Sequence, residues 1–324
     1  MDIKFFYRNR KAGFSIAKVF NTIAEACKID DRVEVPNEKC SLQDIFINTL
    51  YVFRNRSRER INHVTGDIHY ILPALIGCKS VLTVHDTSSY DCAKSVVKRF
   101  LIKYLWHVIP YRCATKIVCI SEETKRSISR FTPREDIEVI YNPVDPSFET
   151  ELKDFNPSNP HFLIIGTAWN KNIENTLTAL DGIDGVVTIV GKLNKAQKKV
   201  ADSLTNMKVI TKQNLSDSEM IKEYRQCDIV LFCTIFEGFG MPIIEGQKTG
   251  RAVITSDLEP HKEIAGLGAL LVNPDKVDSI KKAVYRIIHE DGLYDNLVKN
   301  GLENVKRFDV RKIADDYNNL YNSL

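Results

Sequence analysis

Short runs of aliphatic residues alternate with helix-like segments along most of the chain, and this alternation most limits what the sequence can fold into. In the second half, each run is a continuous stretch rich in Val, Ile and Leu, as expected for strands whose two faces are both covered. These runs occupy residues 161–167, 185–191, 207–211, 228–234, 251–256 and 268–273. The pattern predicts a parallel sheet whose strands are joined by crossover helices.

The first half repeats this pattern less regularly, with predicted strands at residues 3–7, 63–66, 80–86 and 116–121. Between the halves, residues 142–160 contain four prolines together with several Asn, Asp and Ser residues, which is the chemistry of turns and linkers. A chain of 324 residues also exceeds one typical domain. We therefore predict an α/β protein of two Rossmann-like domains facing each other across a cleft, residues 1–150 and 151 onward.

The composition limits the cellular compartment in which the protein is expected and the roles that its cysteines can have. No run of about 18 apolar residues exists, which excludes a spanning helix. The N-terminus is charged and has no cleavable signal pattern. The eight cysteines show no C-x-x-C spacing, so we expect buried thiols in a reducing compartment rather than disulfides or a zinc site. The expected location is cytoplasmic.

The net charge of +3 is shared unevenly. Residues 1–150 hold 23 Lys and Arg against 18 Asp and Glu, a balance of +5, whereas residues 151–324 hold 22 against 24, a balance of −2. A basic first half suits an anionic partner such as a phosphate, an anionic membrane surface or a nucleic acid. An imbalance this small is also compatible with no such partner.

A loop framed by two glutamates, "FEGFGMPIIEG" at 236–246, follows the strand at 228–234. Ligands bind at the carboxyl ends of strands in open parallel sheets. Gly238 and Gly240 allow close approach of the backbone to a ligand, and Pro242 is tolerated in a first helical turn. The backbone N–H groups of residues 239–241 and the positive helix end would then form an anion site suited to a diphosphate.

Two carboxylates are poor phosphate ligands but good acceptors for sugar hydroxyls. The spacing therefore suits a nucleotide sugar, with Glu245 on the ribose, Glu237 on the transferred sugar and backbone amides on the phosphates. The alternative is an ordinary strand-to-helix turn with an acid in the first turn.

Residues 236–266 resemble the signature of the family 4 glycosyltransferases, which are retaining enzymes of the GT-B fold. Glu237 and Glu245 match the family motif of two glutamates separated by seven residues. Four further stretches fall in family order, at residues 116–128, 139–145, 163–177 and 308–324. The resemblance implies an N-terminal acceptor domain at 1–150, a donor domain at 151–307 and a C-terminal helix at 308–324 that packs back toward the first domain.

The resemblance also implies roles in donor binding. Glu245 would hold the ribose, Glu237 a hydroxyl of the donor sugar, and Lys171 the diphosphate; the alternative for Lys171 is a solvated loop lysine. The family often has an arginine after Gly166, whereas this chain has a threonine there. The other implied donor contacts are Thr234, the backbone of Gly238, Phe239, Gly240 and Met241, and the stretch around Leu215, which would bracket the base.

In the first half, His85 follows a predicted strand, and the family places a histidine there that contacts the donor sugar; the alternative is a structural histidine. Weaker candidates for acceptor contacts follow another strand. These are Asp67, His69 and Tyr70. The loop 8–15 contains one glycine, Gly13, with Arg8, Arg10 and Lys11 nearby, which favours an anionic acceptor group.

Two basic stretches suggest a peripheral membrane contact. Residues 54–60 contain four arginines. Residues 94–109 form a predicted amphipathic helix, with apolar positions 97, 101, 104 and 108 beside three lysines and an arginine. The alternative is a Rossmann helix whose apolar stripe lies in the core, and this is the interpretation that we favour.

The resulting prediction is retaining transfer of a sugar from a nucleoside diphosphate sugar, UDP- or GDP-linked, to a hydroxyl of a saccharide or a lipid-linked saccharide in cell-surface glycan synthesis. Glu237, His85 and Lys171 are the predicted catalytic residues. No metal and no other cofactor is expected, and nucleic acid is not an expected partner. The alternative is a non-catalytic protein that binds sugar nucleotides and regulates another enzyme.

Overall fold

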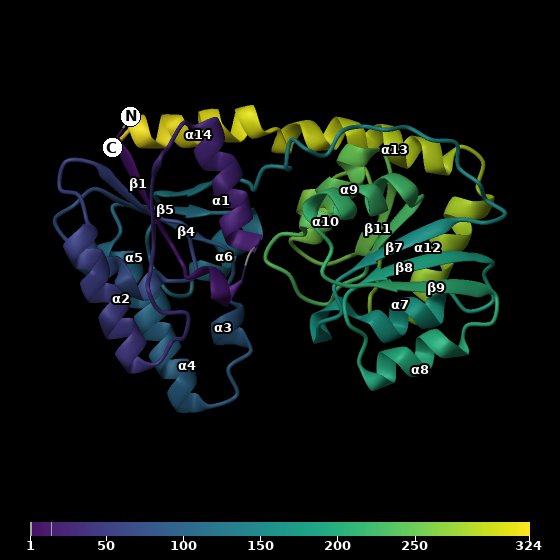
Figure 1. The fold of residues 1–324 in the computed structure, drawn as a ribbon, viewed down its shortest axis with the longest axis horizontal. Helices are drawn as coiled ribbons and strands as arrows, with labels where there is room; N and C mark the ends of the chain where they lie inside the picture. Colours follow the sequence, from purple (N-terminus) through teal and green to yellow (C-terminus); the bar gives the residue numbers. More distant parts are fainter. Residues whose placement is uncertain (1, 14) are drawn as a thin grey trace. The chain divides into compact units, whose positions relative to one another are not determined.

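The computed structural model describes residues 2–13 and 15–324, so Phe14 of the predicted loop 8–15 lies outside the described residues. The chain divides into two compact units. Unit 1 comprises residues 1–143 and 310–324, and unit 2 comprises residues 144–309. Each unit contains one six-stranded parallel sheet with helices between successive strands (Figure 1). The predicted α/β class with parallel sheets is therefore confirmed.

The sheet of unit 1 has the strand order β2-β1-β3-β4-β5-β6, and every pair is parallel. Its strands are β1 (Ile3–Tyr7), β2 (Asp31–Glu34), β3 (Ile61–Val64), β4 (Ser80–Val84), β5 (Lys116–Cys119) and β6 (Ile137–Val139). The four strands predicted from sequence are present. The two that the prediction missed, β2 and β6, are the edge strands.

The helices of unit 1, except for the last one, lie between successive strands of this sheet. They are η1 (Arg10–Ala12), α1 (Ser15–Ala26), α2 (Leu42–Asn55), η2 (His69–Leu75), α3 (Ser88–Asp91), α4 (Val96–Ile102), η3 (Lys103–Val108), α5 (Ile109–Cys113), α6 (Glu122–Ile128) and α14 (Val310–Asn322). The last helix, α14, packs against α1 and belongs to unit 1. Its Tyr321 hydroxyl lies 2.6 Å from Nδ1 of His63 on β3, so the end of the chain is tied into this sheet.

The sheet of unit 2 has the order β12-β11-β10-β7-β8-β9, again parallel throughout. Its strands are β7 (His161–Ile165), β8 (Gly185–Val190), β9 (Met207–Lys212), β10 (Ile229–Phe232), β11 (Ala252–Ser256) and β12 (Leu270–Val272). All six coincide with predicted strands. Because β10 and β7 are neighbours and parallel, the loops that follow them lie at the same edge of the sheet.

Helices cover both faces of the second sheet (Figure 1). They are η4 (Trp169–Lys171), α7 (Ile173–Ala179), α8 (Lys195–Ser203), α9 (Asp217–Gln226), α10 (Met241–Thr249), α11 (His261–Ala265), α12 (Val277–His289), α13 (Leu293–Asn304) and η5 (Val305–Phe308). Two of them begin with a capping box. In this motif the side chain of the N-cap residue accepts from the backbone N–H three residues later, and the side chain of that later residue accepts from the backbone N–H of the N-cap. Asn194 pairs in this way with Gln197, and Ser216 with Glu219.

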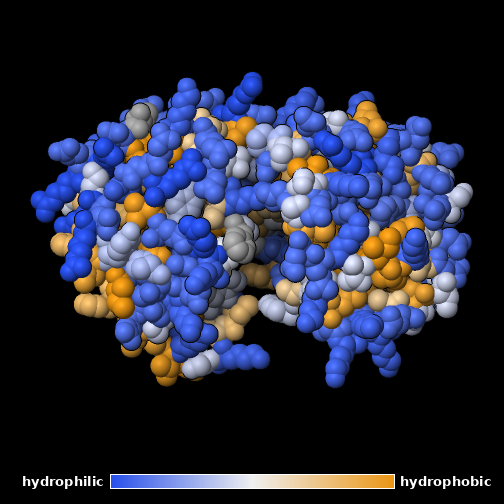
Figure 2. All heavy atoms as spheres, viewed as in Figure 1, coloured by the Kyte–Doolittle hydropathy of each residue, from blue (hydrophilic) through white to orange (hydrophobic). Residues whose placement is uncertain are grey.

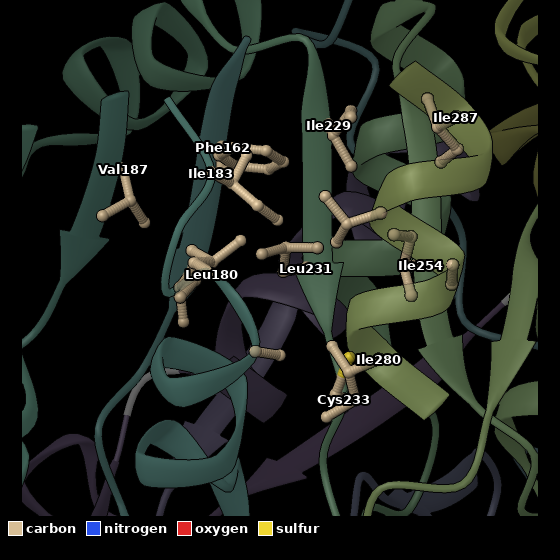
Figure 3. Close-up of a cluster of buried hydrophobic side chains, with 14 of the residues drawn as sticks. Phe162, Leu180, Ile183, Val187, Ile229, Leu231, Cys233, Ile254, Ile280 and Ile287 are labelled. Carbon is tan, nitrogen blue, oxygen red and sulfur yellow. The ribbon is translucent and has the colours of Figure 1, made fainter. Parts of the chain in front are cut away.

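The core of unit 2 is a continuous aliphatic cluster between the sheet and its helices. Figure 3 shows Leu231 and Ile254 from neighbouring strands facing Ile280 and Ile287 of α12. These side chains are at most 2% exposed. Burying an aliphatic side chain of this size contributes about 1.5–3 kcal/mol relative to leaving it in water. This packing fixes the strand ends from which the loops of the candidate site emerge.

The proline-rich segment predicted as a linker is packed onto unit 2. The guanidinium of Arg251, which is fully buried, donates from Nη2 to the carbonyl of Glu151 at 2.8 Å. The ring of Phe155 stacks on Tyr294 with 4.3 Å between centroids. Residues 144–160 therefore belong structurally to unit 2, and the division between the units falls after Pro143.

The eight cysteines are all free thiols, in line with the absence of paired spacing. The prediction that they are buried holds for Cys119, Cys227 and Cys233 but is wrong for Cys40 and Cys92, which are exposed. No helix in the described part of the chain is both long enough and apolar enough to cross a bilayer.

Candidate active site

The loops that follow β7 and β10 meet at the carboxyl edge of the second sheet, where Lys171 forms an ion pair with Glu237. The Lys171 ammonium lies 2.6 Å from Oε1 of Glu237, and both side chains are largely shielded, at 18% and 19% exposure. The same ammonium lies 4.7 Å from the centroid of the Phe232 ring. The structure thus brings together the two residues predicted to contact the diphosphate and the donor sugar.

Gly166, at the end of β7, makes room for this lysine. Its φ is +83°, and a Cβ built there would lie 2.9 Å from Cε of Lys171. The aliphatic stem of the lysine therefore runs directly over the glycine. Any side chain at position 166 would have to displace the stem or shift the backbone, which explains why the family-like loop begins with glycine.

Two asparagines, which the sequence analysis missed, join the loops. Asn170 donates from Nδ2 to the carbonyl of Phe236 at 2.8 Å and to Oε1 of Glu237 at 3.0 Å. Asn172 has φ of +54° and donates to the carbonyls of Cys233 and Pro274. The signal was present in the sequence, because asparagine is among the few residues that tolerate a left-handed conformation.

Glu245, the second glutamate of the loop, lies in the first half of α10 and accepts a hydrogen bond from Tyr224 of α9. The Tyr224 hydroxyl lies 2.5 Å from Oε2 of Glu245. Burial, reinforced by the neighbouring Glu245 carboxylate, holds the pKa of Tyr224 well above its usual range. The tyrosine therefore remains a hydrogen-bond donor and fixes the orientation of the carboxylate.

The N-terminus of α10 is formed by a glycine that no other residue replaces without strain. Gly240 has φ of +109° and ψ of 51°, and a Cβ there would lie 2.9 Å from Cδ1 of Ile243. Pro242 occupies the first turn, as predicted. The side chain of Phe239 is only 4% exposed and meets Phe308 edge to face, so this residue can offer a ligand only its backbone.

The structure corrects the role expected of Thr234. Its side chain is 1% exposed, and its hydroxyl lies 2.9 Å from Nε2 of His261 on α11, so it is turned into the interior and not toward a phosphate. Burial, with a contribution from the charge of Lys171, lowers the pKa of His261 to about 4. His261 is therefore neutral at neutral pH, and it supports the loop between β10 and α10.

Two more donor candidates lie on the same edge of unit 2. Met241 is half-buried at the first position of α10. Leu215 is half-buried in the loop between β9 and α9, next to Asn214 with φ of +54°. The strand order places the loop after β9 beyond β8 and β7, at the far end of the edge from α10.

In unit 1, His85 follows β4 and is held by the neighbouring strand. Its Nε2 lies 2.8 Å from the carbonyl of Thr65, which can only accept, so Nε2 carries the proton. Burial lowers the pKa of His85, so the ring is neutral at neutral pH. A Cβ on Gly66 would lie 2.3 Å from this ring. A neutral ring protonated on Nε2 leaves Nδ1 as an acceptor for a hydroxyl.

The predicted acceptor residues separate into two groups. Asp67 is exposed at the end of β3, where it forms a 2.6 Å ion pair with Arg8, and a Cβ on Gly13 would lie 2.6 Å from the Arg8 guanidinium. His69 and Tyr70, by contrast, are buried at 3% and 4% exposure. Their prediction as acceptor contacts is corrected, because both side chains point into the core of unit 1.

The partners of these buried residues explain the error. Nδ1 of His69 lies 2.7 Å from the carbonyl of Trp106, and the Tyr70 hydroxyl accepts from Asn48 at 2.8 Å. Both residues belong to η2, which packs under α2. The sequence placed them after a strand, but it could not show that a short helix would turn them inward.

The described residues, 2–13 and 15–324, contain no group of three or more His, Cys, Asp or Glu side chains arranged to hold a metal ion. The thiol next to Thr234 offers no nucleophile either, because burial raises the pKa of Cys233 to about 12. The chemistry available at the edge of unit 2 is that of one lysine, two carboxylates, backbone amides and a helix end.

Two protein-family models match this chain. Residues 34–148 match the model described as "Glycosyltransferase Family 4", and residues 151–304 match "Glycosyl transferases group 1". The two matches cover both units in the order that the sequence motifs suggested. The chain belongs to the family 4 glycosyltransferases. Membership agrees with the placement of Glu237 and Glu245 in the loop after β10 and in the helix that follows.

Two curated bacterial glycosyltransferases are similar to this chain over about two thirds of its length or more. The O-antigen chain mannosyltransferase RfbU of Salmonella typhimurium is 29% identical over 68% of this chain, and the match spans 63% of RfbU's own length. The O-antigen biosynthesis glycosyltransferase WclY of Escherichia coli is 26% identical over 77% of this chain and 73% of its own.

Solved structures agree on the fold. A glycosyltransferase from Rickettsia africae superposes with a TM-score of 0.73 at 16% identity, over 99% of this chain and 98% of its own. HepE of Anabaena, solved with UDP-glucose, gives 0.75 at 16% identity over the whole of both chains. These likenesses establish the predicted GT-B fold.

Proposed function

We propose that this chain transfers a hexosyl group from a UDP- or GDP-sugar to a hydroxyl of a saccharide, with retention of anomeric configuration. The observation that carries the proposal is the Lys171–Glu237 pair, which lies at 2.6 Å on the carboxyl edge of the second sheet. A cation and a carboxylate at the same point of a nucleotide-binding edge suit the two ends of the bond that must break, the diphosphate and the sugar.

Donor binding would separate Lys171 from Glu237 and give each residue a new partner on the donor. The diphosphate takes the Lys171 ammonium, because phosphate oxygens offer it two or more negative charges where Glu237 offers one. Glu237 is then available to accept a hydrogen bond from a hydroxyl of the donor sugar. Glu245, oriented by Tyr224, accepts from the ribose hydroxyls. His85 is the residue that we propose unit 1 contributes to the donor sugar, through its unprotonated Nδ1.

The chemical step then depends on positioning and on charge stabilisation. The acceptor hydroxyl attacks the donor sugar on the same face from which the diphosphate departs. A phosphate oxygen of the leaving diphosphate takes the proton of that hydroxyl. Lys171 and the N-terminus of α10 stabilise the negative charge that develops on the diphosphate. The proposal therefore needs no metal ion.

The names of two similar proteins support a more specific proposal for the transferred sugar and the acceptor. RfbU is named as an O-antigen chain mannosyltransferase, and WclY as an O-antigen biosynthesis glycosyltransferase. We propose a hexose such as mannose as the transferred sugar, and as acceptor a lipid-linked saccharide at the cytoplasmic face of a membrane in cell-surface glycan synthesis. A peripheral contact with an anionic membrane would bring the enzyme to such an acceptor.

A donor panel tests this function. Wild-type protein is titrated calorimetrically with UDP-, GDP- and ADP-hexoses in excess EDTA, and the product formed with a saccharide acceptor is analysed by NMR for its anomeric configuration. We expect one base to bind at least tenfold more tightly than the others, turnover in EDTA, and retention. An inverted product refutes the retaining mechanism. Turnover that requires added magnesium or manganese refutes the metal-free one. Binding without turnover on any saccharide favours a regulatory protein instead.

A further inference from the structure

Unit 1 leaves large apolar side chains of two helices in water. On α2 the most exposed are Leu42 at 72% and Phe46 at 68%, and on α4 they are Val96 at 84%, Val97 at 70% and Phe100 at 60%. Phe53 of α2, Leu101 of α4, and Tyr104 of η3 and Ile109 of α5, which continue α4, are each 37–50% exposed. Single exposed apolar residues are normal, but a contiguous exposed patch marks an interaction site. We call these nine residues the apolar face.

This finding contradicts the interpretation of residues 94–109 that was favoured from sequence. A Rossmann helix was expected to turn positions 97, 101, 104 and 108 into the core, but only Val108 packs there and the other three positions are exposed. The buried side of the segment is formed by Ile102 and His107, with Trp106 and Val108 packed against the core of unit 1. The helix therefore has one apolar side in the core and a second apolar side in water.

The two helices belong to one region of unit 1. Both α2 and η3, which continues α4, pack against the buried helix η2. Figure 1 draws α2 and α4 extending toward the same end of unit 1, at the lower left. In the same view, Figure 2 shows hydrophobic side chains gathered over this end.

The charge around the apolar face is almost all positive. Residues 92–109 contain Lys94, Lys98, Arg99 and Lys103 and no Asp or Glu. Residues 41–58 contain three arginines and one acid, Asp44, whose carboxylate accepts from Ser41. Apolar side chains beside lysines and arginines are the composition of helices that lie in the interface of an anionic bilayer.

We propose that α2 and α4 together insert the apolar face into the surface of an anionic membrane. The biological purpose of this membrane contact rests on the proposed function. Docking through the apolar face would present one fixed side of unit 1 to a membrane-bound acceptor. The apolar side chains enter the boundary between headgroups and acyl chains, while Lys94, Lys98, Arg99 and Lys103 contact lipid phosphates.

The structure also shifts the membrane contact away from the arginine run at 54–60. Arg60 is paired with Asp31 at 3.1 Å, and Nη1 of Arg56 donates to the carbonyl of Ala74 at 2.6 Å. Changing these two arginines would disturb unit 1 itself. The charges on α4 are the better targets.

A second copy of this chain is the main alternative occupant. A two-fold symmetric interface would set the same patch against itself. That arrangement would bring the lysines and arginine of residues 94–103 near those of the partner, with no acid in the segment to offset them. Like charges placed face to face across an interface weaken association. An anionic lipid surface offers the opposite charge.

Co-sedimentation with vesicles tests the inference. The vesicles contain phosphatidylcholine alone or with increasing phosphatidylglycerol, at low and at high salt. Two variants are compared with wild type: Phe46→Ser with Phe100→Ser, and Lys94→Ser with Lys98→Ser. The matched control is Leu152→Ser with Leu267→Ser, which removes two leucines of unit 2 that are 67% and 83% exposed.

We expect wild type and the control to bind anionic vesicles and to be released partly by salt. Each of the other two variants should lose about tenfold or more in partitioning. Wild type that ignores anionic vesicles at low salt overturns the proposal, as does equal binding by all variants. A concentration-dependent dimer in sedimentation velocity that the phenylalanine variant abolishes, without vesicle binding, assigns the face to a second copy.

Donor calorimetry on the same proteins separates this inference from the proposed function. The substituted residues lie outside the candidate active site, so donor affinity should equal that of wild type in every variant. Vesicle binding without donor binding would refute the proposed function and leave the membrane face standing. Donor binding without vesicle binding would refute the membrane contact and leave the proposed function standing.

Discussion

At the scale of single residues, the most informative feature is the ion pair that Lys171 forms with Glu237. Lys171 is held by Glu237 and lies near the ring of Phe232, so the ammonium is in place before any ligand arrives. The sequence placed both residues among the candidate site residues, because each lies in a motif with a definite spacing. It could not show that they contact each other, since 66 positions separate them along the chain.

The ion pair leads to the first prediction, for Glu237→Gln. This change releases Lys171 from its carboxylate partner, so calorimetry should show that affinity for the nucleoside diphosphate is unchanged or higher. Turnover should fall on the order of a hundredfold, because a hydrogen bond to the reacting sugar is weakened.

The matched control is Glu303→Gln, which breaks another lysine–glutamate pair of unit 2, the one with Lys306, in a solvent-exposed helix turn. Glu303→Gln should change neither the affinity for the nucleoside diphosphate nor the turnover. A parallel loss of diphosphate affinity and turnover in Glu237→Gln would show that the carboxylate supports the fold of the loop and does not act on the sugar.

Glu245 carries the second prediction. Glu245→Ala removes an acceptor for the ribose hydroxyls, and losing a charged hydrogen bond costs roughly 1.5–3 kcal/mol. Calorimetric affinity for the nucleotide should fall by that amount. Tyr224→Phe leaves the carboxylate but removes the donor that orients it, so a smaller loss is expected. Unchanged affinity in Glu245→Ala would remove this residue from the donor site.

At the scale of elements, the regular parts of the fold followed from the sequence, and the deviations have physical causes. The strands of unit 2 are buried aliphatic runs and were all recognised. In contrast, β2 has the sequence Asp-Arg-Val-Glu and lies at an edge, where polar side chains remain in water. An edge strand of this composition carries no continuous apolar signal. For residues 94–109 the sequence left both a core-facing and an interfacial interpretation open, because periodicity alone does not say which side of a helix is covered. The exposed apolar side of α2 was not predicted.

The start of α10 gives the third prediction. Gly240→Ala places a Cβ 2.9 Å from Ile243 and 3.4 Å from His261, at a φ of +109°. Gly182→Ala is the matched control in the same unit, with φ of +77° but only Lys281 Nζ nearby, at 4.0 Å. Both changes carry the backbone cost of about 1–2 kcal/mol for a side chain at positive φ.

Only the change at 240 adds a steric clash, so urea unfolding should show a free energy of unfolding lower by at least about 1 kcal/mol than in the control. Donor affinity should fall in Gly240→Ala alone, because the change displaces the helix end that we propose contacts the diphosphate. Equal stability and equal donor affinity in the two variants would contradict this account of the loop.

At the scale of the whole molecule, both units contain buried histidines that are neutral in the folded chain. Burial lowers the pKa of His63 and of His107 to about 3 and that of His261 to about 4. His63 lies near His85, His107 near His69, and His261 near Lys171, and each neighbour reinforces the effect of burial.

These histidines give the fourth prediction. In the unfolded chain they take up protons near pH 6.5, whereas in the folded chain they stay neutral until the pH is much lower. Folding stability should therefore be fully present above about pH 6.5 and should fall as the pH decreases below it. From pH 7.5 to pH 5.5 the free energy of unfolding should drop on the order of 1 kcal/mol per buried histidine.

Urea unfolding at the two pH values measures this change, and His261→Gln should reduce the pH dependence of unit 2. A free energy of unfolding that is constant or rises over this interval would show that the histidines are not buried as described.

The proposed function depends most on Lys171, which at the carboxyl edge of the second sheet is proposed to stabilise the departing nucleoside diphosphate. The most direct test measures release of nucleoside diphosphate from the preferred donor, with and without a saccharide acceptor, for wild type and Lys171→Met. We expect acceptor-dependent release by wild type, a loss on the order of a hundredfold in Lys171→Met, and an unchanged affinity of both proteins for the nucleoside without phosphates. Equal rates of release by the two proteins would contradict it.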